Sequence, residues 1–128
     1  MLKSAARFSL VGVVNTFAGL VIISLLVRAG LGDFGANALG YGVCIALSFA
    51  LNRSFTFGVS GSIRWCEVRR YLAVFSLAYG TNVIVLVLMR ELGFAGSIVA
   101  QITAMIAYSA TFFLLSHRYV FATERYAR

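Results

Sequence analysis

Four long stretches without a charged residue constrain this chain more than any other feature. A helix of about 20 residues, rising 1.5 Å per residue, crosses the roughly 30 Å hydrocarbon core of a bilayer. The second stretch ends at residue 51, and we expect its helix to continue to residue 57. The pattern therefore predicts an all-α, polytopic membrane protein with transmembrane helices over residues 8–27, 36–57, 71–89 and 95–115.

The composition supports a multi-pass protein of the cell membrane, meaning the inner or plasma membrane. The chain is 61% hydrophobic and 12% charged, whereas soluble domains are about 45–50% apolar and about 25% charged. The first apolar stretch exceeds the roughly 7–15 apolar residues of a signal peptide, so we expect a retained helix. The net charge of +7 does not indicate nucleic acid, because the cations lie between apolar stretches and suit a membrane surface.

The distribution of cations predicts that both termini are cytoplasmic. Nine lysines and arginines fall on the side of the termini and of the loop 58–70, against two, Arg28 and Arg90, on the other side. We expect one transmembrane domain over residues 1–128. Residues 64–70 of the loop suit either an amphipathic interfacial helix or a plain basic loop, and the sequence leaves both open.

The two halves of the chain resemble each other. Two segments, the first box (residues 51–57, LNRSFTF) and the second box (residues 115–121, LSHRYVF), align without a gap. Each follows an apolar stretch and combines polar residues, cations and aromatic rings, which suit the interface of a bilayer. We expect two helical hairpins of the same orientation, related as a parallel repeat about an axis along the membrane normal.

The sequence gives no support for an enzyme, a metal site or a cofactor. Its four acidic residues, Asp33, Glu67, Glu91 and Glu124, all lie outside the predicted spans. His117 is the sole histidine, and no nucleophile, histidine and carboxylate arrangement can be assembled around it. Because proton- or cation-coupled transporters rely on intramembrane carboxylates, the absence also argues against a small multidrug-type exporter, which shares this length and helix count.

The remaining candidates are arginines that flank the spans and amides within or beside them. A guanidinium binds phosphate oxygens with two parallel hydrogen bonds, so Arg7, Arg53, Arg70 and Arg118 are candidates for a phosphate site. Each can equally anchor a helix end and fix the topology. The amides fit either helix–helix adhesion or a polar path for a sugar, and both interpretations remain open. These amides belong to Asn15, Asn52, Asn82 and Gln101.

The chain resembles the GtrA-like family of small four-helix membrane proteins over residues 5–121. The resemblance rests on Arg7-Phe8, Val11-Gly12, Asn15, Ser48-Phe49, Asn52 to Phe57, Arg70-Tyr71 and Arg118 to Phe121. Residues 52–57 match the family's run of Asn, a basic residue and alternating aromatics, although Phe55 stands where the family often has Trp. This match favours a functional over an anchoring role for Arg53.

The resemblance implies translocation of a polyprenyl-phosphate-linked sugar from the cytoplasmic to the outer leaflet, for cell-surface polysaccharide synthesis or glycosylation. It also implies a partner membrane glycosyltransferase that makes this lipid. The alternative is a scaffold that recruits or stabilises such an enzyme. Because four helices leave little room for an enclosed path, we expect a homo-oligomer.

Overall fold

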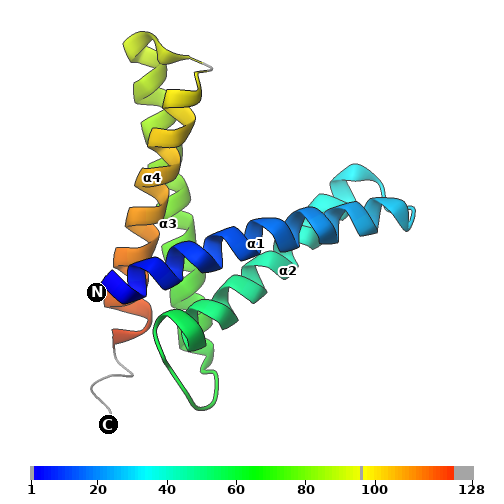
Figure 1. Cartoon of the computed structure of the whole chain (residues 1–128), viewed down its shortest axis with the longest axis vertical. Helices are drawn as coiled ribbons and strands as arrows, with labels where there is room; N and C mark the ends of the chain where they lie inside the picture. The colour runs from blue at the N-terminus through cyan, green and yellow to red at the C-terminus, as the bar shows by residue number, and fades with distance from the viewer. Residues whose placement is uncertain (1, 96, 123–128) are drawn as a thin grey trace. The chain divides into compact units, whose positions relative to one another are not determined.

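Each half of the chain forms a helical hairpin. The computed structural model describes residues 2–95 and 97–122, apart from the side chains of residues 33 and 34. Helices α1 (Leu2–Arg28) and α2 (Asp33–Leu51) belong to a first compact unit, Met1–Ser60. Helices α3 (Trp65–Met89) and α4 (Ile98–Leu115) belong to a second unit, Gly61–Arg128. Within each unit the two helices lie side by side (Figure 1). We call the units the first and the second hairpin.

Three π-helical segments extend the α-helices. They are η1 (Asn52–Thr56) after α2, η2 (Arg90–Phe94) after α3 and η3 (Ser116–Val120) after α4. In the part of the chain that the structure describes there is no strand, and four helices are long and apolar enough to cross a membrane. These spans are Leu2–Arg28, Gly35–Thr56, Trp65–Phe94 and Ile98–Val120. The predicted all-α class with four membrane-spanning helices is therefore confirmed.

Small residues let the helices of the first hairpin pack closely. Ala36, Gly40 and Cys44 are buried on α2 at intervals of four residues, which places them on one helix face. A Cβ atom added to Gly40 would overlap Ile23 of α1, and one added to Gly19 would lie 3.1 Å from the Cys44 Sγ. Close backbone approach through small residues is the usual packing mode of membrane helices.

The second hairpin combines small residues with an aromatic cluster. Ala100 and Ala104 of α4 are buried near the hairpin turn. Toward the other end, the Tyr71 ring lies 5.1 Å from the Phe112 ring and 6.3 Å from the Phe121 ring. Edge and offset arrangements at these distances stabilise a pair by about 0.5–1.5 kcal/mol beyond the area that it buries. The cluster joins α3, α4 and the residue that follows η3.

The helix bounds differ from the sequence prediction mainly at two starts. Helix α1 begins at Leu2 rather than residue 8, since nothing in the basic lead breaks a helix. Helix α3 begins at Trp65 rather than residue 71, after an extended Arg64. Residues 65–70 are thus the first turns of α3, neither a separate interfacial helix nor a loop, and Glu67 lies within a helix. The predicted single domain, parallel repeat and cytoplasmic termini stay predictions, and residues 124, 125 and 128 lie outside the described residues.

Candidate functional site

The first box is built on a π-helical turn. The Phe57 amide donates to the Asn52 carbonyl at 2.9 Å, five residues back along the chain. The wider turn rotates three polar side chains inward: Asn52, Arg53 and Thr56 are all buried. Single π-turns within α-helices occur frequently at functional sites. The segment that sequence analysis selected is therefore also a local departure from regular helix.

Hydrogen bonds within the helix hold the Asn52 side chain. Its Nδ2 donates to Ser48 Oγ at 3.2 Å, and Thr56 Oγ1 donates to Asn52 Oδ1 at 3.0 Å. The three residues lie four apart and form one polar ladder. Because Asn52 is only 1% exposed, its established contacts are structural, and a contact with a sugar remains a prediction. Sequence analysis missed Ser48 and Thr56, although their spacing from Asn52 is a visible signal.

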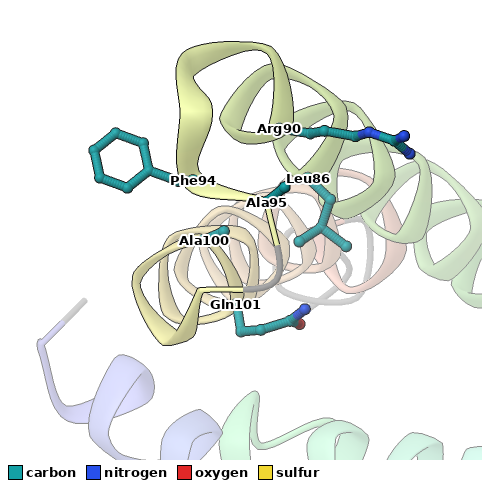
Figure 2. A pocket seen from close by; sticks show the side chains of 6 residues that line it. All are labelled: Leu86, Arg90, Phe94, Ala95, Ala100 and Gln101. Atoms are coloured by element: carbon teal, nitrogen blue, oxygen red, sulfur yellow. The ribbon is translucent and has the colours of Figure 1, made fainter.

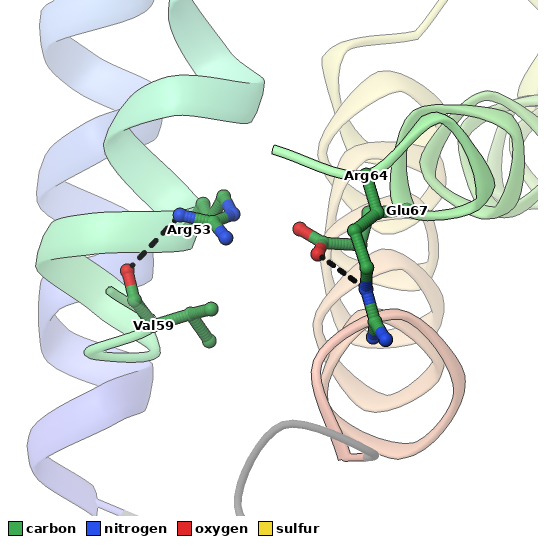
Figure 3. A network of polar contacts seen from close by, with 4 residues as sticks. All are labelled: Arg53, Val59, Arg64 and Glu67. Carbon is green, nitrogen blue, oxygen red and sulfur yellow. Dashed lines mark hydrogen bonds and ion pairs between the residues drawn. The ribbon is translucent and has the colours of Figure 1, made fainter. Parts of the chain in front are cut away.

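Arg53 is the buried cation of the first box. Its Nη1 donates to the Val59 carbonyl at 3.4 Å (Figure 3). The Val59 amide in turn donates to the Arg53 carbonyl at 2.8 Å. These two contacts fold the segment after η1 back onto the box. The Arg53 residue is 6% exposed, and the burial of a charge costs free energy that its contacts must offset. This burial distinguishes Arg53 from Arg7, Arg70 and Arg118, which are exposed.

Arg7 joins the start of α1 to the same box. Its Nη1 donates to the Phe55 carbonyl at 3.2 Å, and its guanidinium carbon lies 5.2 Å from the centre of the Phe55 ring. Cation–π contacts at exposed sites stabilise by about 0.5–1 kcal/mol. Arg7 remains exposed, so its guanidinium can bind an anion while it contacts Phe55. The first hairpin thus brings Arg7, Asn52 and Arg53 together at one end.

The second box repeats the first in structure as well as in sequence. In η3 the Phe121 amide donates to the Ser116 carbonyl at 3.1 Å, again five residues back. Asn52 and Ser116 are both buried, and so are Phe57 and Phe121, the aromatic residues that close the two boxes. The two π-helical segments occupy the same register in the gapless alignment.

This register pairs Arg53 with His117 rather than with Arg118. His117 is half-buried, and its ring lies 6.2 Å from that of Phe113. Arg118 occupies the position of Ser54, and both side chains are exposed. The two arginines of the boxes are therefore unlike in environment: Arg53 is buried, whereas Arg118 is exposed.

The start of α3 contributes further charged groups to the second hairpin. Arg70 is exposed and lies next to the buried Tyr71, at the end of the hairpin where η3 contacts α3. Arg64 Nε lies 3.4 Å from Glu67 Oε1, and this pair is also drawn in Figure 3. Glu67 is 1% exposed, which sequence analysis did not anticipate because it placed this residue at the membrane surface, in either an interfacial helix or a loop.

The amides are dispersed along the hairpins. Asn15 lies midway along α1, and its Oδ1 is buried without a hydrogen-bond partner among the described residues. Its backbone carbonyl accepts from Cys44 Sγ at 3.9 Å. Asn82 is half-buried within α3, and Gln101 is exposed in the first turns of α4. Gln101 thus lies at the end of the second hairpin opposite to Arg70 and Arg118.

No group of three His, Cys, Asp or Glu side chains in residues 2–95 and 97–122 is placed to hold a metal ion. The chemistry on offer from the described side chains is the binding of an anion by guanidinium groups and of hydroxyls by amides.

Comparison with known proteins identifies a family. The sequence model of the GtrA/DPMS transmembrane domain matches residues 7–121, which include both boxes and all four helices. No curated protein and no solved structure matches the chain. The matched range begins at Arg7, which contacts the first box, and ends at Phe121, which closes the second box. The chain therefore belongs to the GtrA/DPMS transmembrane-domain family.

Proposed function

We propose that the chain moves a polyprenyl-phosphate-linked sugar from the cytoplasmic to the outer leaflet of the cell membrane, without a covalent step. Membership of the GtrA/DPMS family and four helices that can cross a membrane support this function. A lipid substrate keeps its polyprenyl chain in the bilayer while only its sugar-phosphate head crosses. The protein then needs a cation that collects the phosphate and polar groups that accompany the head.

The observation that carries the proposal is the buried Arg53 in the π-helical first box. Its guanidinium is held against the Val59 carbonyl, and Arg7 presents a second guanidinium at the same end of the hairpin. Charge-assisted hydrogen bonds to phosphate are about twice as strong as neutral ones, and a guanidinium can form two in parallel. Arg70 and Arg118 supply further exposed cations in the second hairpin and are assigned a supporting role in phosphate capture.

The amides are assigned to the path of the sugar. The buried, unpartnered Oδ1 of Asn15 can accept a hydrogen bond from a sugar hydroxyl, as can the half-buried amide of Asn82. Asn52 is assigned a structural role, because its side chain is hydrogen-bonded to Ser48 and Thr56 within the helix. Because four helices leave little room for an enclosed path, we include a homo-oligomer in the proposal. We also include a membrane glycosyltransferase, which would make the lipid-linked sugar.

The test uses liposomes that hold a polyprenyl-phosphate sugar in both leaflets and an impermeant sugar-modifying reagent outside. With the wild-type protein we expect modification to pass the outer-leaflet fraction. Arg53→Gln should slow this second phase about tenfold or more, because a hydrogen bond to a charged group contributes about 1.5–3 kcal/mol. Arg53→Lys keeps the charge without the planar fork and should be intermediate. Arg28→Gln, at the other end of α1, serves as the matched control.

Two results would count against the proposal. A wild-type rate for a well-inserted Arg53→Gln would remove Arg53 from phosphate capture. A plateau at the outer-leaflet fraction with wild-type protein would favour the scaffold. The exposed Trp65 and Arg69 at the start of α3 offer that alternative a docking surface, and co-purification with a glycosyltransferase would then identify it.

A further inference from the structure

The turn of the second hairpin contains a cavity of about 300 Å³. It lies between the end of α3 and the first turns of α4 (Figure 2). Among the described residues, the lining consists of Leu86, Arg90, Phe94, Ala95, Ala100 and Gln101. Four of these six side chains are apolar, and the two others are a cation and an amide. Nothing in the function proposed above uses Arg90.

The local backbone opens this cavity. The π-helical segment η2 continues α3, and Gly93 then reverses the chain with a φ of 87°, a conformation that favours glycine. Ser97 begins the return: its backbone is extended, and its Oγ accepts from the Ala100 amide at 3.2 Å. The amino-terminal end of α4, where the helix dipole is positive, therefore borders the cavity through Ala100 and Gln101.

The polar groups of the lining suit a phosphate, and its apolar groups suit a hydrocarbon chain. Figure 2 shows the Arg90 and Gln101 side chains on either side of Leu86, with both polar ends extended away from Phe94. Both residues are exposed, so their donors can reach a ligand. Glu91, the neighbouring carboxylate, is exposed and does not belong to the described lining. The positive end of α4 adds to the attraction for an anion.

The cavity lies at the end of the second hairpin opposite to Arg70. Twenty residues of helix separate Arg70 from Arg90, which corresponds to about 30 Å, the thickness of the hydrocarbon core. We infer that this cavity binds the phosphate group of an isoprenoid phosphate at the membrane face opposite to Arg70 and the second box. The inference rests on the proposed function, for which it supplies the site that receives the lipid head after crossing.

The experiment uses the full chain in detergent micelles with an isoprenyl phosphate that carries a photoreactive diazirine next to its phosphate. Adducts are mapped by peptide mass spectrometry. We expect labelling within residues 86–101 to fall about tenfold in Arg90→Gln, as the loss of a charge-assisted hydrogen bond predicts. Gln101→Leu provides a second variant with a smaller loss. Arg28→Gln, which removes the cation near the turn of the first hairpin, should label like the wild type.

Competition identifies the source of the phosphate. Unlabelled isoprenyl phosphate should remove the label, whereas isoprenol or inorganic phosphate at the same concentration should not. Equal competition by isoprenol would overturn recognition of the phosphate, and equal competition by inorganic phosphate would overturn recognition of a lipid. Unchanged labelling in both Arg90→Gln and Gln101→Leu would also overturn the inference.

The outcome separates this site from the proposed function. Arg53→Gln should keep the label at residues 86–101, because Arg53 does not belong to the described lining of the cavity. Labelling without translocation by the wild-type protein would contradict the proposed function and leave the site standing. Translocation without labelling would contradict the site and leave the function standing.

Discussion

Gly40 marks a point where α2 approaches α1 so closely that a methyl group does not fit. A Cβ atom added there would overlap Cγ1 of Ile23, an atom near the Ile23 backbone rather than at the free end of the side chain. Gly42, two residues further along α2, has no atom within 4 Å of the same added Cβ. The two glycines therefore lie in the same helix and undergo the same substitution, but only the Cβ at residue 40 meets a neighbouring side chain.

The steric cost follows from the difference between the two alanine variants. Alanine at either position gains up to about 1 kcal/mol of helix stability over glycine, and this gain cancels in the comparison. Extra atoms in a packed interface cost about 1–3 kcal/mol. We therefore expect Gly40→Ala to unfold with a free energy about 1–3 kcal/mol lower than Gly42→Ala.

Reversible unfolding in mixed detergent micelles measures this difference. Ile23→Ala removes the overlapping atom, so Gly40→Ala and Ile23→Ala should be less damaging together than the sum of their separate costs, with a coupling of about 0.5–3 kcal/mol. Equal stability of the Gly40→Ala and Gly42→Ala variants, or strict additivity with Ile23→Ala, would refute the close approach of α1 and α2.

Two further predictions concern buried polar atoms. Thr56→Val deprives Asn52 Oδ1 of its donor and should lower the free energy of unfolding by about 1–3 kcal/mol, whereas Thr103→Val, at an exposed hydroxyl, should change it by less than about 0.5 kcal/mol; equal effects in the same unfolding assay would contradict the polar ladder. Asn15→Leu should leave stability unchanged or raise it by up to about 1–3 kcal/mol, because it removes a buried acceptor without a described partner. The same variant should slow translocation in the liposome assay, and a clear loss of stability would show that this oxygen has a structural partner.

The ends of the helices show which boundaries could be predicted from the local sequence and which could not. Gly30 and Gly93 adopt φ values of 92° and 87° in the two hairpin turns, and both lie between the predicted spans. The start of α3 at Trp65 was not predicted, because the composition of residues 64–70 suits an interfacial helix, a turn of a longer helix or a loop. In the structure Glu67 lies within α3, where it is buried.

The sequence pattern locates the two boxes but not the environment of their side chains. The polar and cationic pattern selected both boxes, and each proved to be a π-helical turn. The pattern could not show that Arg53 is buried while Arg118 is exposed, because both are arginines at the end of an apolar helix. Their difference depends on one residue of register, which places His117 rather than Arg118 at the position of Arg53.

Arg90 is a residue that the sequence did not mark as part of a site and that the structure places beside a cavity. In the sequence it is a cation beside a turn, and it counted only toward topology. In the fold it borders a cavity with Gln101, which is eleven residues away along the chain.

Span number and charge distribution could be read from the chain because they are one-dimensional sums over neighbouring residues. Burial of Arg53, the unpartnered oxygen of Asn15 and the cavity beside Arg90 could not. These features depend on which face each helix turns toward its neighbour. A single π-turn contains one extra residue, so it changes which side chains lie on that face.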